Sequence, residues 1–314
     1  MTNIRGTDLD IFPLGLGGNT FGGNSDAATS EEVLDAFLDR GGNFIDTADQ
    51  YAFWIPGNQG GESETILGTW MQRRGLRDRV IVATKVGGMP TLKGLAPHTI
   101  TTAVEDSLRR LQTDTIDLYY AHFDDTSQTI ESIATSFDAL VKAGKVRYVG
   151  VSNMAGDRIE AWIQVARENG LAVPVALQPE YNLVERRGYE HGAGPLAARH
   201  GLAVFPYFSL ASGFLSGKYR TRADLQGAAR GKAVEAYLTD DGLAVVEALG
   251  RIASARGAAM ATVALAWLLA KPTVTAPLAS ATSVEQLEEL MAAPGLALSA
   301  ADVAALDDAS QPFA

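Results

Sequence analysis

NFIDTADQY (43–51), RVIVATK (79–85) and DLYYAH (117–122) are the stretches that decide how this chain folds. β-branched and aromatic residues fill each run, and a reactive polar side chain lies at or just past its end. These reactive residues are Asp46, Tyr51, Lys85 and His122. A parallel barrel carries its active site on the loops at the carboxyl ends of its strands. The three runs therefore predict strands that bring four reactive side chains to one place.

Apolar runs alternate with helix-like periodic segments along the chain, which indicates βα units and a parallel sheet. Strands are expected at residues 14–17, 43–47, 80–85, 117–122, 146–152, 175–178, 202–207 and about 273–279. Helices are expected after Ser30 to about residue 40, near 62–73, 99–111 and 129–143, and at 299–309. No Gly-x-Gly-x-x-Gly fingerprint follows the first strand, so the early glycines at 15, 17, 18, 22 and 23 are interpreted as turn formers. The pattern predicts an α/β fold, a single (β/α)8 TIM barrel over residues 1–314 with extended loops at its C-terminal face.

Two loops stand out by length or composition. After the strand that ends at Tyr207, about 30 residues pass before a helical pattern resumes, whereas common loops have roughly 2–6 residues. This length predicts a lid or a ligand-binding segment. The loop AFWIPGNQGG (52–61) carries Phe53 and Trp54 directly after Tyr51, and we expect it to wall a substrate pocket.

Composition excludes several classes of protein. The 314 residues are 46% hydrophobic and carry a formal net charge of −11, which disfavours binding to nucleic acid or to an anionic membrane. The chain has no cysteine, so disulfides and thiolate metal sites are excluded. No apolar run approaches the roughly 20 residues of a membrane span, and a cytoplasmic location is expected. His98, His191 and His200 lack metal-type spacing, so no metal site is predicted.

The four reactive residues suit proton transfer to an oxygen. An isolated tyrosine has a pKa of about 10, and a neighbouring cation such as Lys85 lowers that value by favouring the phenolate. Asp46 would keep a buried Lys85 charged, and His122 would add a hydrogen bond at the same point. Such a group protonates a carbonyl oxygen that becomes negative, which matches carbonyl reduction. Because none of these side chains delivers hydride, a nicotinamide cofactor is required.

The chain resembles the aldo-keto reductases over nearly its whole length. The motifs that carry the resemblance are NFIDTADQY (43–51), GGESETILG (60–68), VATKVG (82–87), GVSN (150–153), LQPEYN (177–182), FPYFSLASGFLSGKY (205–219) and ATSVEQLEE (281–289). The resemblance implies Tyr51 as the general acid, Lys85 and Asp46 as the pair that tunes it, and His122 as the residue that orients the carbonyl. Substrate contacts are expected from Tyr51, Phe53, Trp54 and His122.

The resemblance also implies where a nicotinamide cofactor binds. At the nicotinamide end it places Gly18, Asn19, Thr20, Asp46, Ser152, Asn153 and Gln178, with Tyr207 stacked on the ring. For the pyrophosphate and its ribose it implies Ser209, Leu210, Gly213, Leu215, Ser216 and Lys218. At the adenosine end of the cofactor it implies contacts from Ser280, Thr282 and Gln286.

The adenosine end departs from the pattern of many NADP-preferring relatives. These relatives have a basic residue where this chain has Thr282, and often an asparagine where it has Leu290. A neutral hydroxyl holds a ribose phosphate less strongly than Arg or Lys does. The family's habit favours NADP, with Lys218, Arg220 or Arg222 as alternative phosphate contacts, while NAD or dual use stays open.

Two other functions are compatible with these residues. The first is a redox-sensing regulatory subunit that binds nicotinamide cofactor with little turnover. The second is a lyase or epimerase in which Lys85 forms a Schiff base, although the cofactor motifs would then be idle. The substrate is expected to be a small carbonyl or alcohol, sugars included, and neither its identity nor the oligomeric state follows from the residues.

Overall fold

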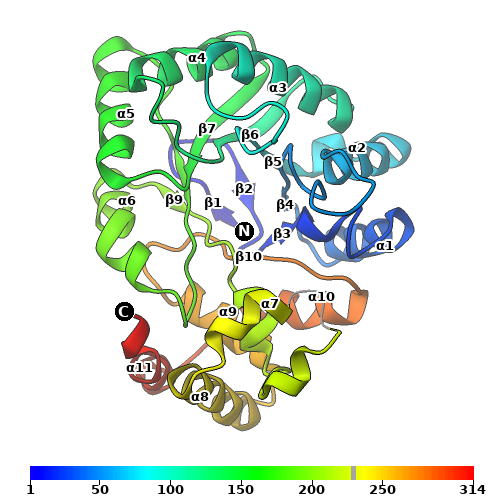
Figure 1. Cartoon of the computed structure of the whole chain (residues 1–314), viewed down its shortest axis with the longest axis vertical. Coiled ribbons are helices and arrows are strands. Elements are labelled where there is room, and N and C mark those ends of the chain that lie inside the picture. The colour runs from blue at the N-terminus through cyan, green and yellow to red at the C-terminus, as the bar shows by residue number, and fades with distance from the viewer. Residues whose placement is uncertain (228–230) are drawn as a thin grey trace.

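The protein is a barrel of eight parallel strands, seen along its axis in Figure 1. The computed structural model describes residues 1–227 and 231–314. Residues 228–230, inside the long segment predicted after Tyr207, lie outside the described residues. The spatial order of the strands is β10-β3-β4-β5-β6-β7-β8-β9. Their bounds are β3 Gly15–Gly17, β4 Phe44–Asp46, β5 Ile81–Val86, β6 Ile116–Ala121, β7 Val146–Ser152, β8 Ala176–Gln178, β9 Ala203–Val204 and β10 Leu278–Ala279. The predicted (β/α)8 fold is confirmed.

Backbone hydrogen bonds join the two ends of this strand order. Thr275 N donates to Val204 O at 2.9 Å, and Leu278 N donates to Pro206 O at 2.8 Å. On the other side of β10, Gly15 N donates to Pro277 O at 3.0 Å. A Cβ at Gly15 would lie 2.4 Å from the Leu278 side chain, so β3 and β10 approach closely only because residue 15 is glycine.

Helices surround the strands and cover their outward faces (Figure 1). The helices of seven or more residues are α1 Ala27–Asp39, α2 Glu62–Arg74, α3 Pro97–Leu111, α4 Ile130–Lys142, α5 Gly156–Asn169, α6 Gly194–His200, α8 Asp240–Arg256, α9 Met260–Leu269, α10 Val284–Met291 and α11 Ala300–Ala309. Side chains alternate along each strand, so Ile45 and Val82 join the outer core while Phe44 and Ala83 fill the barrel interior. Helix α9 is buried along most of its length, as expected for a packing element.

A hairpin that was not predicted from the sequence lies at the N-terminal ends of the strands. It consists of β1 (Thr2–Asn3) and β2 (Asp10–Ile11), and it lies inside the ring of strands in Figure 1. Ile4, Leu9 and Ile11 belong to the same buried cluster as the interior residue Phe44. The hairpin therefore fills the end of the barrel opposite the strand termini that carry the reactive residues.

Two local predictions need correction. Helix α1 begins after Asp26, whose side chain accepts from Thr29 N, so Ser30 lies inside the first turn and instead donates to Asp26 O. Gly15 and Gly17 belong to strand β3, because strand pairing there demands small residues more than turn freedom.

The long segment after Tyr207 contains short helical turns rather than a plain loop. They are η4 Ala211–Ser216, η5 Arg222–Leu225, α7 Gly231–Val234 and η6 Glu235–Tyr237. No single helix among the described residues has the length and apolar composition of a membrane span. Two pairs, α8 with α9 and Val284–Gly295 with α11, meet that criterion only jointly and are bent by 98° and 119°.

Candidate active site

Lys85 is the centre of the site. Strands β4 and β5 are paired neighbours, so their carboxyl ends bring Asp46 and Lys85 together. The Lys85 ammonium donates to Asp46 Oδ2 at 2.6 Å, to Thr47 O at 2.7 Å and to Tyr51 Oη at 2.8 Å. These three acceptors use all three protons of the ammonium group. Lys85 is fully buried and Asp46 nearly so, and their pairing compensates for the desolvation of both charges.

The electrostatics keep Tyr51 protonated. Burial raises the pKa of Tyr51 well above its usual value, and the Asp46 carboxylate adds to this effect. From the sequence we expected the pKa of Tyr51 to be lowered, because that expectation took only the neighbouring ammonium of Lys85 into account. In the folded site burial and Asp46 outweigh the ammonium. Burial likewise lowers the pKa of Lys85, while Asp46 opposes that change.

His122 follows strand β6 and is a neutral imidazole. Burial, with a smaller contribution from Lys85, holds the pKa of His122 well below its ordinary value. Its ring lies 6.3 Å from the ring of Tyr51, measured between centroids. The buried Nδ1 atom of His122 has no hydrogen-bond partner among the described residues. A neutral imidazole beside Tyr51 can hydrogen-bond a small polar ligand without adding charge.

A continuous hydrogen-bond chain extends from this centre along β8 and β7. Gln178 Nε2 donates to Asp46 Oδ1 at 2.8 Å, and Ser152 Oγ donates to Gln178 O at 2.8 Å. Asn153 Nδ2 donates to Ser152 Oγ at 3.0 Å, and Tyr207 Oη donates to Asn153 Oδ1 at 2.7 Å. Asn153 has a left-handed backbone, with a φ of +47°. The chain holds these side chains in one fixed arrangement around the cavity.

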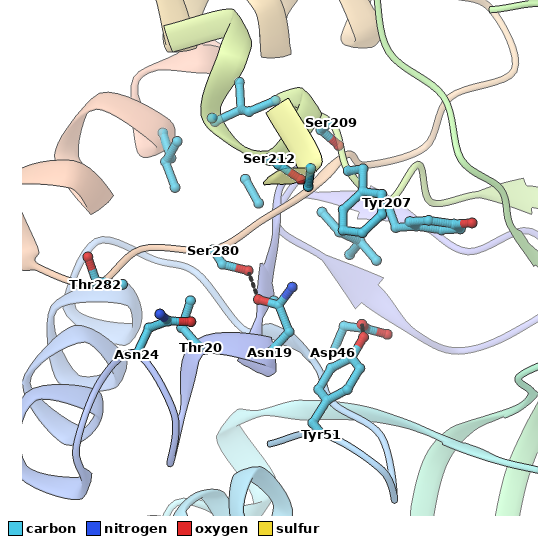
Figure 2. A pocket seen from close by; sticks show the side chains of 18 of the residues that line it. Asn19, Thr20, Asn24, Asp46, Tyr51, Tyr207, Ser209, Ser212, Ser280 and Thr282 are labelled. Atoms are coloured by element: carbon cyan, nitrogen blue, oxygen red, sulfur yellow. Dashed lines mark hydrogen bonds between the residues drawn. The ribbon is translucent and has the colours of Figure 1, made fainter. Parts of the chain in front are cut away.

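A cavity of about 1040 Å³ opens above these residues. In Figure 2, Tyr51 and Asp46 lie at one end of the cavity, and Thr282, Asn24 and Thr20 lie at the other end. Tyr207, Ser209 and Ser212 lie across the cavity from Tyr51. Between the two ends Ser280 Oγ donates to Asn19 Oδ1 at 2.7 Å. The cavity is therefore elongated, and its two ends have different chemistry.

Most residues expected at the site line this cavity. They are Asn19, Thr20, Asp46, Tyr51, Trp54, His122, Ser152, Asn153, Gln178, Tyr207, Ser209, Leu210, Gly213, Ser216, Lys218, Ser280, Thr282 and Gln286. Gly18, Phe53, Lys85 and Leu215 are not part of the lining. Lys85 lies beneath it, Leu215 is fully buried in the core, and Gly18 O accepts from Ser63 Oγ. Gly17 lines the cavity next to the position expected for Gly18.

Several lining residues were missed from the sequence. They are Gly17, Asn24, Gln50, Ile55, Phe123, Phe208, Ser212, Tyr219, Ala233, Ala261, Leu278, Ala279, Glu289 and Leu290, the last having been noted only as a departure from the family pattern. Phe123 and Phe208 carried a usable signal, because each directly follows a predicted site residue. Glu289 did not, since a glutamate on a charged helix is usually solvated.

The segment after Tyr207 forms one wall of the cavity and has an unusual backbone. Ala211, Ser212 and Gly213 are three consecutive residues with positive φ, at +48°, +57° and +96°. The N–H groups of Ala211 and Gly213 are used inside the turn, because they donate to Phe208 O at 2.7 Å and to Leu210 O at 2.9 Å. Lys218 lines the same wall and is the one lysine or arginine in the described lining. This wall therefore offers the Lys218 ammonium to an anionic ligand such as the pyrophosphate of a dinucleotide.

A second group of buried charges lies behind the site. Glu64 on α2 is fully buried, accepts from Thr84 Oγ1 at 2.5 Å and accepts from Arg110 Nε at 2.7 Å. Asp49 is also buried, and no side chain of the described residues hydrogen-bonds its carboxyl oxygens, although the backbone N–H groups of Gln50 and Gly87 favour its charged form. Burial, and then Glu64, raise the pKa of Asp49 to about 7.

The chain is a (β/α)8 barrel with a cavity that adjoins the carboxyl ends of its strands, and comparisons with known proteins identify its family. The chain belongs to the aldo/keto reductase family, whose model matches residues 13–311. It is 34% identical to an uncharacterized oxidoreductase, YrpG, of Bacillus subtilis over 95% of this chain and 91% of that protein. It is 35% identical to a probable voltage-gated potassium channel subunit beta of Oryza sativa, over 93% and 90%. It is 32% identical to norsolorinic acid reductase B of Dothistroma septosporum, over 96% and 79%.

Proposed function

We propose that this protein transfers hydride between a nicotinamide cofactor and the carbonyl of an aldehyde or ketone, or catalyses the reverse alcohol oxidation. The observation that carries the proposal is the Lys85 ammonium at the floor of the cavity, bonded at once to Tyr51 Oη and Asp46 Oδ2. The Lys218 ammonium and the aromatic face of Tyr207 in the cavity lining fit the cofactor that this chemistry needs. The relatives named oxidoreductase and reductase are consistent with it.

The roles of the residues follow from their protonation states. Tyr51 is held protonated, so it gives its proton to the carbonyl oxygen as that oxygen gains negative charge. Lys85 stays hydrogen-bonded to the phenol oxygen and stabilises the phenolate that results. Neutral His122 hydrogen-bonds the carbonyl oxygen and sets its direction. A nicotinamide bound in the cavity would supply hydride to the carbonyl carbon, and the proton that Tyr51 gives to the oxygen completes the alcohol.

Tyr51→Phe tests this assignment. We expect turnover to fall roughly 10²- to 10⁴-fold, because general acid catalysis contributes about that factor. Cofactor binding should be retained, since the phenol ring stays in place. Steady-state rates with a panel of aldehydes, together with fluorescence titration of the reduced cofactor, provide both measurements.

Tyr148→Phe is the matched control, because the Tyr148 hydroxyl bonds Asp8 near the N-terminal hairpin, away from the cavity. It should keep full turnover. Near-normal turnover in Tyr51→Phe would remove Tyr51 from the role of acid.

The adenosine end supports NAD in preference to NADP. Thr282, Gln286, Glu289 and Leu290 line this end, and Thr282 Oγ1 already donates to Gln286 Oε1 at 3.1 Å. A carboxylate here suits a ribose hydroxyl, whereas a ribose phosphate needs an arginine or lysine. Arg220 is turned away, with its Nε donating to Gly217 O. We therefore infer that NADH binds at least as tightly as NADPH, contrary to the family's habit.

A regulatory subunit is the second candidate function, favoured by the similarity to a probable potassium channel subunit beta. In that case the cofactor would stay bound while substrate-dependent oxidation stays slow. Single-turnover oxidation of bound reduced cofactor by an aldehyde separates the two, because an enzyme completes it within its normal turnover time. A Schiff-base role is disfavoured by the burial of Lys85 and its three acceptors, and borohydride trapping tests it.

A further inference from the structure

The motif GGESETILG (60–68) leads into helix α2, and none of its residues belongs to the cavity lining that the structure describes. Two of its polar side chains, Ser63 and Glu64, are nevertheless fully buried in the first turn of that helix. Burying a hydroxyl or a carboxylate is costly unless the group is hydrogen-bonded. The partners of these two side chains therefore indicate what the turn holds in place.

Ser63 is the middle member of a hydrogen-bond relay beneath the site. Thr47 Oγ1 donates to Ser63 Oγ at 2.8 Å, and Ser63 Oγ donates to Gly18 O at 2.8 Å. The carbonyl oxygen of Thr47 in turn accepts from the Lys85 ammonium at 2.7 Å. Thr47, Ser63 and Lys85 are all fully buried, and Gly18 is buried as well. The relay therefore connects Lys85 to Gly18 through buried groups alone.

At one end of the relay, Thr47 supplies one of the three acceptors of the Lys85 ammonium. Thr47 directly follows β4, and its N–H donates to Ala83 O on β5 at 2.8 Å. Its side chain is held separately by Ser63. Because both its amide and its side chain are fixed, the carbonyl oxygen of Thr47 stays directed at Lys85.

At the other end of the relay, Gly18 belongs to the wall of the cavity. It begins the short turn η1 (Gly18–Thr20), and its two sequence neighbours, Gly17 and Asn19, both line the cavity. A Cβ at residue 18 would lie 2.7 Å from Ser63 Oγ. The hydroxyl of Ser63 therefore reaches this wall because residue 18 is glycine.

Glu64 gives Ser63 a fixed position. Its carboxylate accepts from Thr84 Oγ1 on β5 and from Arg110 Nε on α3, so the first turn of α2 is tied to the strand that carries Lys85. Gly61, just before the helix, has a φ of +84°, and a Cβ there would lie 2.4 Å from the Arg110 side chain. This glycine lets Arg110 pass the start of the helix and reach Glu64. Groups held in this way can position their neighbours precisely.

On this geometry we propose that Ser63 is a positioning residue, which holds the proton donor made of Lys85 and Tyr51 at one fixed separation from the cavity wall at Gly18. The nicotinamide end of the cofactor is expected along that wall. Proton and hydride go to the two ends of one carbonyl bond, so their donors must keep a constant mutual distance. This inference rests on the proposed function.

Three variants separate the hydrogen bonds of the relay from simple packing. Ser63→Ala and Thr47→Val each remove one hydroxyl, whereas Thr47→Ser keeps the hydroxyl and loses only a methyl group. We expect single-turnover oxidation of bound NADH by propanal or benzaldehyde to slow roughly ten- to hundredfold in the first two variants, because a misplacement of about 1 Å costs up to that factor. Both aldehydes should slow alike, and Thr47→Ser should stay close to the wild type.

Ser30→Ala is the matched control. Ser30 is also fully buried in the first turn of a helix, and its hydroxyl donates to Asp26 O at 2.6 Å at the start of α1. This variant loses a comparable hydrogen bond without touching the relay. It should keep the full single-turnover rate, while urea denaturation should show a loss of stability similar to that of Ser63→Ala.

Two further measurements need no turnover. Fluorescence titration should show that the dissociation constant of NADH changes far less than the rate in Ser63→Ala, because the relay acts on the dinucleotide only through the wall. Crystal structures of Ser63→Ala and Thr47→Val without cofactor should show the Thr47 carbonyl oxygen displaced from Lys85 Nζ, or the turn at Gly18 displaced from Thr47.

A Ser63→Ala protein that keeps the wild-type rate would overturn the inference, and so would a Thr47→Ser protein that slows as much as Thr47→Val. Unchanged positions of the Thr47 carbonyl and of Gly18 in both crystal structures would also overturn it. If the wild type reduces neither aldehyde with either dinucleotide, the proposed function itself fails. The crystal structures still report on the relay in that case, so the two failures are distinct.

Discussion

Asp49 is a buried carboxyl group with little to stabilise its charge. It is 2% exposed and lies close enough to Tyr51 and Lys85 to act on both electrostatically. Burial is the largest cause that raises its pKa to about 7, and Glu64 adds to it, while the backbone N–H of Gln50 and, less strongly, Arg110 and the backbone N–H of Gly87 oppose both. The native state therefore takes up a proton at Asp49 at a pH where the unfolded chain is already ionised.

The stability of the protein should fall as the pH rises from about 4 to about 7. A raised pKa in the folded state means that the contribution of Asp49 is fully present below the unfolded value of 3.8 and is lost as the pH passes about 7. The difference corresponds to at most about 4 kcal/mol, at about 1.4 kcal/mol per pH unit. Asp49→Asn should remove this slope and be the more stable protein at pH 8.

Urea denaturation at pH 5 and pH 8 measures the effect. Asp114→Asn, at an exposed loop position, is the control and should follow the wild type at both pH values. An unchanged slope in Asp49→Asn would place the pH dependence elsewhere.

At the residue scale, the sequence predicts which residues form the site better than it predicts their burial and their pKa. Asp46, Tyr51, Lys85 and His122 were recognisable because each lies at or near a strand end, and the barrel brings three separate strands together. The direction of the Tyr51 pKa was wrong because burial depends on packing that no local pattern contains. Asp49 was missed for the same reason, although it lies two residues from Tyr51.

At the scale of helices, two glycines inside helices, Gly68 on α2 and Gly250 on α8, have very different space around them. A Cβ at Gly68 on α2 would lie 2.2 Å from the backbone oxygen of Arg110 and 2.6 Å from the carbonyl carbon of Leu111. Gly250 on α8 has no neighbour nearer than 3.9 Å to the same position. The absence of a side chain at Gly68 therefore allows α2 to approach the end of α3.

Gly68→Ala should destabilise the protein by roughly 1–3 kcal/mol, the usual cost of overpacking, in spite of the better helix propensity of alanine. Gly250→Ala should stabilise it by roughly 0.5–1 kcal/mol, because alanine restricts the unfolded chain and fills open space. Chemical denaturation followed by circular dichroism compares the two. If both substitutions changed the free energy of unfolding by the same amount, the close approach of α2 to α3 would not be the reason that residue 68 must be glycine.

Strands and helices were predictable where periodicity extends over several residues. The interiors of α2, α3 and α4 and of β5, β6 and β7 agree with the expected ranges to within a few residues. The start of α1 was misplaced because Asp26 and Ser30 are both good capping residues, and the sequence does not choose between them. The hairpin β1–β2 was missed because each strand has only two residues and its stability comes from the barrel interior.

At the scale of the whole molecule, the net charge of −11 acts on the choice of cofactor. The overall field repels an anionic ligand, and NADPH carries one more phosphate than NADH. Only Lys218, among the lining residues that the structure describes, offers a positive charge to the dinucleotide. The lining and the overall field both disfavour the extra phosphate on these grounds, in the same direction as the departure at Thr282 that the sequence already shows.

The ratio of the NADPH and NADH dissociation constants should therefore depend on salt. We expect NADH to bind at least as tightly as NADPH at 0.1 M salt and more clearly so at 0.01 M, because the Debye length grows from about 10 Å to about 30 Å. Thr282→Arg should tighten NADPH binding roughly tenfold or more through a charge-assisted contact, with little effect on NADH. Thr102→Arg, on the exposed face of α3, adds the same charge far from the adenosine end and should shift only the salt dependence. Fluorescence titration of both dinucleotides measures these constants, and tighter binding of NADPH by the wild type would restore the expectation of NADP with Lys218 as the phosphate contact.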